Sequence, residues 1–447
     1  MTSLLFTSIF FLIAITILVA VHEFGHFLVA RTLGIRVLRF SIGFGTVIWK
    51  YISPKTQTEY VLSALPLGGY VKMLDEEEAP VAAADLPQAF NRQALWVRSA
   101  VVVAGPAFNI LFAFLVYWLF FMVGDISIKP LVGQVTPKSI AEIAGFKLGD
   151  TITTVDKVAT DDWEEVLLAL ISNWSSNDRI PIGVVDVNGN SQNRWLPRVA
   201  IDRLSSNPKV FDVLGIKPAL PKLPAQIGAV IAESPAAVAG LRAGDVIISV
   251  DNQQVSDWNA FVYHVRAHPE LVMELQVQRQ NTSIALQIKP RSYQEGAKVV
   301  GRIGAEVAIP DVTRRFYPGE ALHKATLRTA QMLQLMFSGL GKMFTGQSKI
   351  VDNVSGPISI ANFAGKAASN GFASFLKFLA AISISLGVLN LLPIPILDGG
   401  HLLLYAAEGI TGKPIPEWYK IQAQRLGIII IILLMSLALY TDFKFLG

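Results

Sequence analysis

The 447-residue sequence contains no cysteine and is poor in charged residues, which make up 16% of the chain. The lack of cysteine excludes disulfides, thiolate zinc ligands and a cysteine nucleophile. It also leaves the redox compartment undetermined. The formal net charge is only +4, and Lys and Arg form no block, so nucleic acid is not an expected partner.

Apolar residues are in excess and account for 52% of the chain. The mean hydropathy of +0.46 is too high for an ordinary soluble protein or a disordered chain. It is too low for a chain that lies entirely in a membrane. The length allows about three domains. We therefore expect a few membrane spans with a water-soluble portion between them.

Four segments are long enough, or nearly so, to cross a bilayer, which takes about 20 apolar residues. They cover residues 2–21, 99–123, 378–397 and 426–440. No Lys or Arg precedes the first segment and no A-x-A site follows it, so we expect it to be retained and not removed as a signal peptide.

Lys and Arg residues between the spans predict the orientation of the chain. Residues 27–98 hold eight of them, and the short loop at 413–425 holds three. Such loops face the cytoplasm by the positive-inside rule. We therefore expect both termini and the long middle segment on the outer side.

The middle segment contains a repeat. Residues 139–163 realign on residues 234–258 with a constant offset of 95 and no gap. Each copy predicts a short Ala-rich helix, a Gly-Asp turn, an alternating strand and a second helix. The pattern resembles the circularly permuted bacterial PDZ domain, which implies a small sandwich whose groove accepts a peptide strand. The alternative is a pair of spacers with blocked grooves.

The first span leads into the sequence HEFGH at residues 22–26. Residues four apart share one face of a helix, so His22 and His26 can bind one Zn²⁺. Glu23 is then placed to take a proton from the attacking water. HExxH also arises by chance, but ionisable groups at the end of an uncharged membrane helix are costly and functional by default.

A catalytic zinc usually has three protein ligands, so a third is needed. The next histidine is His264, inside the repeat, which excludes a third histidine close in sequence. Asp398 is the better candidate, because it follows a long apolar run in which Pro393 and Pro395 break the helix. The carbonyls freed there are tolerated only inside protein or in a wet cavity. His401 can also bind, but we favour a loop position or a supporting role for it.

Other polar positions are weaker candidates. Glu59 and residues 76–78 are carboxylates that we interpret as solvated loop charge. Gly105, Pro106 and Asn109 are expected to shape and pack the second span and not to touch substrate. Residues 321–344 predict an amphipathic helix on the outer membrane surface, with a plain linker helix as the alternative.

Residues 40–49 and 59–65 predict the strands of a hairpin sheet. The glycines at positions 43 and 45 permit close approach of another backbone, although ordinary turn glycines are the alternative. A membrane helix that is to be cut must first unwind, and a strand edge re-pairs the freed backbone groups. This hairpin is a candidate for that edge.

Four motifs together resemble the site-2 protease family of intramembrane zinc metalloproteases. They are HEFGH at 22–26, LPLGGYVK at 65–72, AGPAFN at 104–109 and NLLPIPILDGGH at 390–401. The resemblance implies one Zn²⁺ per chain, with His22, His26 and Asp398 as ligands and Glu23 as the catalytic base. It also implies strand addition of the substrate to a membrane-associated hairpin. The implied substrate-binding residues are Asn390, Gly43, Phe44, Gly45, Tyr70, Pro393 and Pro395.

The predicted fold is a multi-pass α-helical membrane protein with four transmembrane helices, a membrane-associated β-hairpin sheet, and two mixed α/β PDZ domains between spans 2 and 3. The expected divisions are 1–123 for the first two spans, 127–220 and 221–310 for the PDZ domains, 320–371 for a linker region and 372–447 for the last two spans.

The family resemblance implies a protease of a bacterial inner membrane that controls an envelope stress response, with its active site near the cytoplasmic face. Implied substrates are a single-span anti-sigma factor already shortened by a first protease, and leftover signal peptides. Lipid surrounds the spans, and peptide C-termini are possible ligands of the PDZ grooves. Two alternatives stay open: a non-enzymatic PDZ scaffold or peptide receptor, and a metal-ion carrier, which would need further polar ligands in the membrane.

Overall fold

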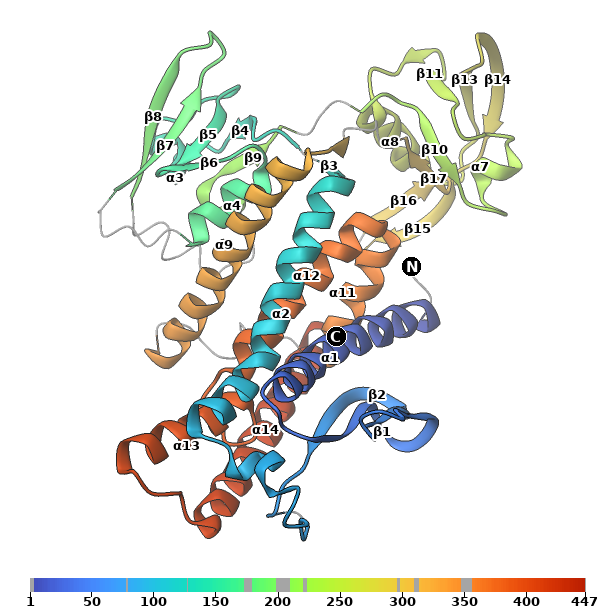
Figure 1. Ribbon diagram of the computed structural model, residues 1–447. Helices are drawn as coiled ribbons and strands as arrows, with labels where there is room; N and C mark the ends of the chain where they lie inside the picture. The colour runs from blue at the N-terminus through green and yellow to red at the C-terminus, as the bar shows by residue number, and fades with distance from the viewer. Residues whose placement is uncertain are drawn as a thin grey trace.

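The computed structural model describes residues 4–77, 79–126, 128–172, 179–197, 210–219, 223–295, 298–308, 313–346 and 356–446. Long helices form a body that has two β-rich modules at one end and a small sheet toward the other (Figure 1). Within the described ranges, four helices are long and apolar enough to cross a membrane. They are α1 (Leu4–Thr32), α2 (Leu95–Val123), α12 (Phe372–Asn390) and α14 (Glu417–Leu446).

The third span differs from the one expected at residues 378–397. Helix α12 ends at Asn390, and residues 391–397 form tight turns before α13 (Asp398–Thr411) begins. Pro393 and Pro395 lack the N–H groups that would continue the helix. Hydropathy alone therefore overestimated this span, and Asp398 begins a new helix.

Helix α9 (Pro318–Phe344) is the amphipathic helix expected at 321–344, but it does not lie across the outer end of the spans. It runs alongside α2 and packs against α2 and α12 (Figure 1). Ala321 and Ala325 are fully buried there, and the Ser385 hydroxyl of α12 donates a hydrogen bond of 3.6 Å to the sulfur of Met336. Small residues let the helices approach closely, so the apolar face meets protein. Helix α11 (Pro357–Ser369) then leads toward α12.

Strands β1 (Val37–Ile52) and β2 (Glu59–Met73) form the small sheet and extend beyond the strands expected at 40–49 and 59–65. Ile42 pairs with both Leu62 and Gly69, and Ile52 pairs with Glu59. The two strands therefore fold back on each other as a sheet of four segments.

The sheet packs on the half of α1 that contains HEFGH. Phe27 of α1 shares an apolar cluster with Phe40 and Val71 of the sheet and with Val101 of α2. Two short 3-10 helices, η1 (Leu86–Gln88) and η2 (Phe90–Arg92), connect the sheet to α2. This packing fixes the sheet beside the two histidines of α1.

The first module consists of nine described elements. They are β4 (Val132–Val135), α3 (Ile140–Ile143), β5 (Thr151–Val155), β6 (Val158–Ala159), α4 (Trp163–Ser172), β7 (Arg179–Val185), β8 (Ser191–Pro197), α6 (Val210–Leu214) and β9 (Ile216–Pro218). Its strands form a sheet of order β6-β5-β7-β8 and a separate pair, β4-β9.

The second module has the same arrangement. Its elements are β10 (Ile227–Val230), α7 (Pro235–Val238), β11 (Val246–Val250), β12 (Gln253–Gln254), α8 (Trp258–Ala267), β13 (Met273–Arg279), β14 (Thr282–Ile288), β15 (Arg291–Glu295), β16 (Lys298–Arg302) and β17 (Ala305–Val307). The sheet order is β12-β11-β13-β14, the separate pair is β10-β17, and β15 and β16 add a hairpin.

The repeat in sequence is also a repeat in local structure. Ser139 accepts a hydrogen bond from the backbone N–H of Glu142 at the start of α3, and Ser234 caps α7 in the same way. Gly145 and Gly240 follow these helices with φ of +85° and +81°, a conformation that favours glycine. Strand β3 (Asp125–Ile126) pairs with β18 (Thr313–Arg314), so the chain enters and leaves the two modules at one point.

Within the described ranges, a charge cluster joins the first module, and not the second, to the helical body. The ion pairs of this cluster link Asp161 and Glu165 to Lys324, and Glu164 to Arg328 and Lys377. The 95-residue offset places Ser256, Asn259 and Ala260 at the three acidic positions in the second module. Helix α4 of the first module packs against α9, whereas among the described residues no element of the second module packs comparably against a helix of the body.

Candidate metal centre

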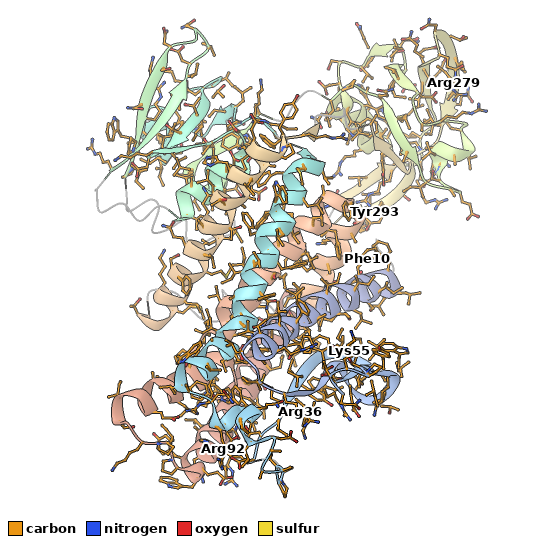
Figure 2. All side chains as sticks on the ribbon, viewed as in Figure 1. Phe10, Arg36, Lys55, Arg92, Arg279 and Tyr293 are labelled. Carbon is orange, nitrogen blue, oxygen red and sulfur yellow. The ribbon has the colours of Figure 1, made fainter. Side chains whose placement is uncertain are left out.

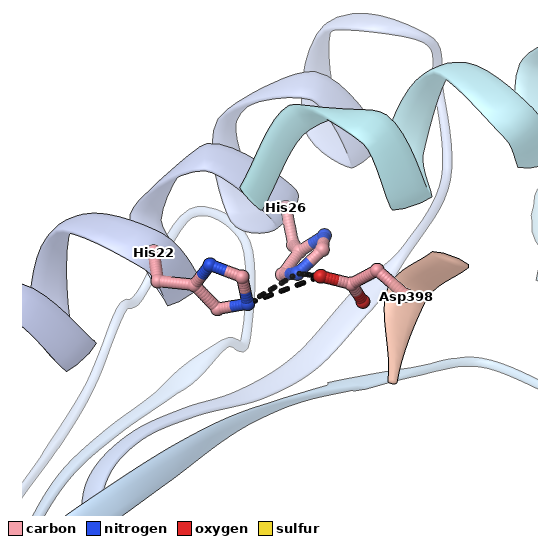
Figure 3. Close-up of side chains that lie close together, drawn as sticks. All are labelled: His22, His26 and Asp398. Carbon is pink, nitrogen blue, oxygen red and sulfur yellow. Dashed lines mark hydrogen bonds and ion pairs between the residues drawn. The ribbon is translucent and has the colours of Figure 1, made fainter. Parts of the chain in front are cut away.

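Three side chains from two distant helices meet in the helical body. His22 and His26 lie one turn apart on α1, and Asp398 comes from the first turn of α13 (Figure 3). Asp398 Oδ2 lies 3.2 Å from His22 Nε2 and 3.6 Å from His26 Nε2. The two Nε2 atoms are 3.3 Å apart.

These spacings fit a zinc ion. Tetrahedral zinc bound at about 2.0–2.1 Å places its ligand atoms roughly 3.3 Å from one another. Asp398 Oδ2 is buried and has no hydrogen-bond partner. A buried carboxylate oxygen needs a partner, and a cation bound here would provide one. His22, His26 and Asp398 lie close enough to share a metal ion. In the described part of the chain, no other group of three His, Asp or Glu side chains does so. Two imidazoles and one carboxylate leave a fourth position for substrate or water.

Glu23 lies between this cluster and the sheet. Its carboxylate interacts electrostatically with His22, His26 and Asp398 and accepts a hydrogen bond from the backbone of Val71 in β2. A Cβ atom at Gly69 would lie 3.0 Å from Glu23 Cγ, so the glycine lets β2 approach α1 at this point. A proton-accepting group is thereby held beside a sheet edge and three candidate ligands.

Helix α2 supports both histidines from behind. His26 Nδ1 lies 2.8 Å from the carbonyl oxygen of Val101, which can only accept, so this nitrogen carries the hydrogen. A Cβ atom at Gly105 would collide with His26 Nε2 and lie 2.7 Å from His22 Cε1. Asn109 Nδ2 lies 3.2 Å from His22 Nδ1.

Gly105 and Asn109 were expected to shape and pack the second span, and the structure adds that both pack against the candidate ligands. The missed signal is their spacing in AGPAFN. The two residues are four apart and share one helix face, as His22 and His26 do on α1.

The turn before α13 and the helix itself position Asp398. A Cβ atom at Gly399 would collide with the carbonyl of Leu391, and one at Gly400 would collide with the carbonyl of Ile394. The two glycines therefore allow the turn to fold onto the start of α13. The far end of α13 is held by Glu408, which accepts two hydrogen bonds from Arg98 of α2, at 2.6 and 3.3 Å.

The residues implied as substrate contacts lie in two places. Asn390 Nδ2 lies 3.4 Å from His22 Nε2 and thus beside the cluster. The rings of Phe44 and Tyr70 stack in the sheet with centroids 6.2 Å apart. Gly43 and Gly45 have φ of +90° and +84° there. Pro393 is exposed, and Pro395 packs against Gly427 of α14.

The weaker carboxylate candidates are engaged in surface ion pairs. Glu59 pairs with Arg39 and Lys50, and Glu76 pairs with Arg92. Glu78, the last residue of the acidic run, lies outside the described residues. His401 is not in the three-residue cluster. Glu76 lies in a turn, as expected for loop charge, but Glu59 is the first residue of β2, so the interpretation of Glu59 as loop charge was wrong.

Comparison with known proteins gives consistent matches over the whole chain. The profile of peptidase family M50 matches residues 10–434. The regulator of sigma-E protease RseP of Escherichia coli K12 is 41% identical over 453 aligned positions, covering 99% of this chain and 100% of that protein. A putative zinc metalloprotease of Vibrio cholerae is also 41% identical and covers 99% of each chain.

Two solved structures each match part of the chain. The PDZ domain of the SdrC-like protein from Listeria monocytogenes is 16% identical and covers 22% of this chain and 98% of its own, with a TM-score of 0.17. The HtrA-type protease AlgW with a decapeptide is 17% identical and covers 36% of this chain and 56% of its own, with a TM-score of 0.14. At these TM-scores neither structure decides the fold of a module.

Proposed function

Because this chain belongs to peptidase family M50, we propose that it is a zinc metalloprotease that cuts single-span membrane proteins within the membrane. The observation that carries the proposal is the meeting of His22, His26 and Asp398 at zinc-like spacing among helices apolar enough to span a bilayer. We assign one zinc ion per chain to these three ligands.

The ligands, Glu23 and Asn390 would have different roles in peptide-bond hydrolysis. His22, His26 and Asp398 would hold the zinc ion, which would supply Lewis-acid activation of a peptide carbonyl and of water. Glu23 would accept a proton from the attacking water and return it to the leaving amine. Its position between the ligands and β2 suits both transfers. The Asn390 amide beside His22 Nε2 is placed to hold the substrate backbone near the scissile bond.

The sheet gives an unwound substrate a place to pair. Residues 69–73 of β2 pair on one side only, with residues 37–42 of β1, so their other side is an edge. This edge lies against Glu23 at Gly69. An extended substrate strand added here would satisfy its backbone groups next to the metal ligands. Phe44 and Tyr70, stacked on the same sheet, and the positive-φ backbone at Gly43 and Gly45 would shape this surface.

The orientation proposed from the Lys and Arg counts agrees with the arrangement of the elements. Figure 2 places Arg36, Lys55 and Arg92 toward the sheet end of the helices and Arg279 in the second module. We propose that the sheet end faces the cytoplasm of a bacterium, and that the modules and both termini lie outside the inner membrane.

We interpret the modules as PDZ domains over residues 127–220 and 221–310. Their grooves would bind peptide ends or exclude substrates with bulky outer domains. The relative from Escherichia coli K12 is named regulator of sigma-E protease RseP. The proposed substrate class is accordingly a shortened single-span anti-sigma factor, with leftover signal peptides as a second class.

Metal analysis and a cleavage assay on Glu23→Gln test the proposed function. The full chain, purified in detergent, should contain about one zinc ion in both the wild type and the variant. Cleavage of a single-span membrane protein should fall by about 10²–10⁴-fold in the variant, as loss of a general base does. Undiminished cleavage by Glu23→Gln, in a preparation free of other proteases, would contradict the role of Glu23. A peptide receptor would keep its function in Glu23→Gln and lose it when a groove is blocked.

A further inference from the structure

Asn109 of α2 is a buried polar residue with an incomplete set of partners. Its side chain is fully buried, and its Oδ1 has no hydrogen-bond partner as placed. The polar contact of its amide is with Nδ1 of His22, at 3.2 Å. Burying an amide with so few partners costs free energy that a leucine of the same size would not cost. The contact with His22 is therefore what this residue contributes beyond packing.

The hydrogen on the His22 ring can be assigned from the cluster. His22 Nε2 faces His26 Nε2 and Asp398 Oδ2, so Nε2 is the atom that would bind a metal. A neutral imidazole that binds through Nε2 carries its hydrogen on Nδ1. That hydrogen needs an acceptor. The structure places Asn109 Nδ2 toward Nδ1, but the oxygen and nitrogen of an amide have nearly the same shape and are assigned from their hydrogen bonds. Exchanging the two atoms would place the amide oxygen opposite Nδ1 and give its hydrogen an acceptor.

We propose that Asn109 is a positioning residue, whose amide oxygen accepts the hydrogen of His22 Nδ1 and thereby keeps Nε2 free and aimed at the metal position. The inference rests on the proposed zinc site. His26 supports it, because its Nδ1 has an acceptor from the same helix, the carbonyl of Val101 at 2.8 Å. Acceptors of this kind fix the tautomer and the ring orientation of metal-binding histidines. Helix α2 thus supplies the acceptor for both rings.

Asn109 is itself held in place from α12. The buried Ser383 hydroxyl donates a hydrogen bond of 2.8 Å to the backbone carbonyl of Asn109. This hydrogen bond goes to the backbone of Asn109 and not to its side-chain amide. Ser383→Ala therefore perturbs the same buried region while leaving the side-chain acceptor for His22 intact. The chain therefore offers a matched control for packing effects.

The test measures zinc affinity by competition with a chromophoric chelator, on the full chain in detergent. Asn109→Leu should weaken zinc binding by about 10–100-fold, the usual cost of losing such a partner. Asn109→Asp keeps an acceptor oxygen of similar size and should stay within a few-fold of the wild type. Ser383→Ala should also stay close to the wild type. Thermal melting of the zinc-free proteins checks folding, and Asn109→Ala replaces Asn109→Leu if the latter does not fold.

Several results would overturn the inference. Wild-type zinc affinity in Asn109→Leu would do so directly. Equal losses in Asn109→Leu and Asn109→Asp would show that an acceptor is not what matters, and an equal loss in Ser383→Ala would assign the effect to packing. If the wild type binds no zinc, the proposed function itself fails and the inference fails with it. If the wild type binds zinc, any failure concerns Asn109 alone.

Discussion

Oδ2 of Asp398 lies 3.2 Å from Nε2 of His22, although the two residues belong to helices near opposite ends of the chain. The turn over residues 391–397 makes this approach possible, because it ends α12 and starts α13 at the aspartate. The metal centre therefore depends on the start of α13 lying against α1.

Replacing Asp398 should remove one zinc ligand. Asp398→Asn is expected to lower zinc affinity by more than the roughly 10–100-fold that loss of an outer partner costs, and to abolish cleavage. His401→Gln is the control, because His401 lies one turn away on α13 but outside the ligand cluster. Equal zinc loss in the two variants, measured by metal analysis after dialysis, would contradict the assignment of Asp398.

Adding a methyl group at Gly105 should displace the histidines. The new Cβ would collide with His26 Nε2 and would lie 2.7 Å from His22 Cε1, so neither ring could keep its position. Gly105→Ala is expected to weaken zinc binding without unfolding α2, since alanine favours helix. Gly339→Ala on α9 meets no atom within 4 Å and should bind zinc like the wild type. Normal zinc affinity in Gly105→Ala would show that the ligands are placed differently.

Charge reversal should detach the first module from the helical body. Glu164 lies between Arg328, whose side chain is 7% exposed, and Lys377. Burial works to raise the pKa of Glu164, but these two cations outweigh it and hold the pKa below its usual value. Glu164→Lys is expected to lower the free energy of unfolding by about 1–3 kcal/mol. Breaking a fully buried ion pair would cost more, but the Glu164 side chain is 38% exposed.

The second module provides the control for this charge reversal. Asn259 occupies the position of Glu164 in the repeat and is exposed. Asn259→Lys should leave thermal stability and the hydrogen exchange of α8 unchanged, whereas Glu164→Lys should increase the exchange of α4. Equal effects of the two substitutions would mean that the charge cluster does not hold the first module.

The second module should gain acid sensitivity when Arg279 is replaced. Burial works to raise the pKa of Asp245, but hydrogen bonds from Arg279 hold it below its usual value. A folded-state pKa below the unfolded value of about 3.9 gives stability that is present above that pH and lost as the pH falls through the folded-state pKa. Arg279→Met leaves the buried carboxylate unpaired, so unfolding should begin at a pH roughly 1 unit higher.

Hydrogen exchange of β11 and β13 in the full chain, followed as the pH is lowered, measures this shift. Arg291→Met changes an exposed arginine of the same module and should leave the transition where it is. An unchanged transition in Arg279→Met would show that the Arg279–Asp245 pair contributes no pH-dependent stability.

Local rules were sufficient for the features that depend on spacing along one helix or strand. The i, i+4 relation of His22 and His26 follows from helix geometry, and the structure places both rings toward Asp398. The 95-residue repeat likewise predicted a short helix, a strand and a second helix in each copy, which are α3, β5 and α4 in the first module and α7, β11 and α8 in the second. In both cases the information lies in residues close in sequence, or in a comparison of the chain with itself.

Features set by packing between distant helices were not predictable in the same way. From the sequence, Asn109 is a polar residue in an apolar span. Its contact with His22 could not be predicted without knowing that α1 packs against this face of α2. Helix α9 has one apolar face, but the sequence does not tell whether lipid or protein covers that face. The early end of the third span is different, because hydropathy extended that span to residue 397 while Pro393 and Pro395 already indicated a break in the helix before Asp398.

The pairing of β3 with β18 has a topological consequence. Paired strands lie about 4.8 Å apart, a distance that a two-residue turn can bridge. The ends of α2 and α9 could thus be joined directly, and both modules could be excised without rerouting any helix. The two modules are thus an insertion in a helical body. Excising them would deprive Lys324, Arg328 and Lys377 of the body of their acidic partners in the first module.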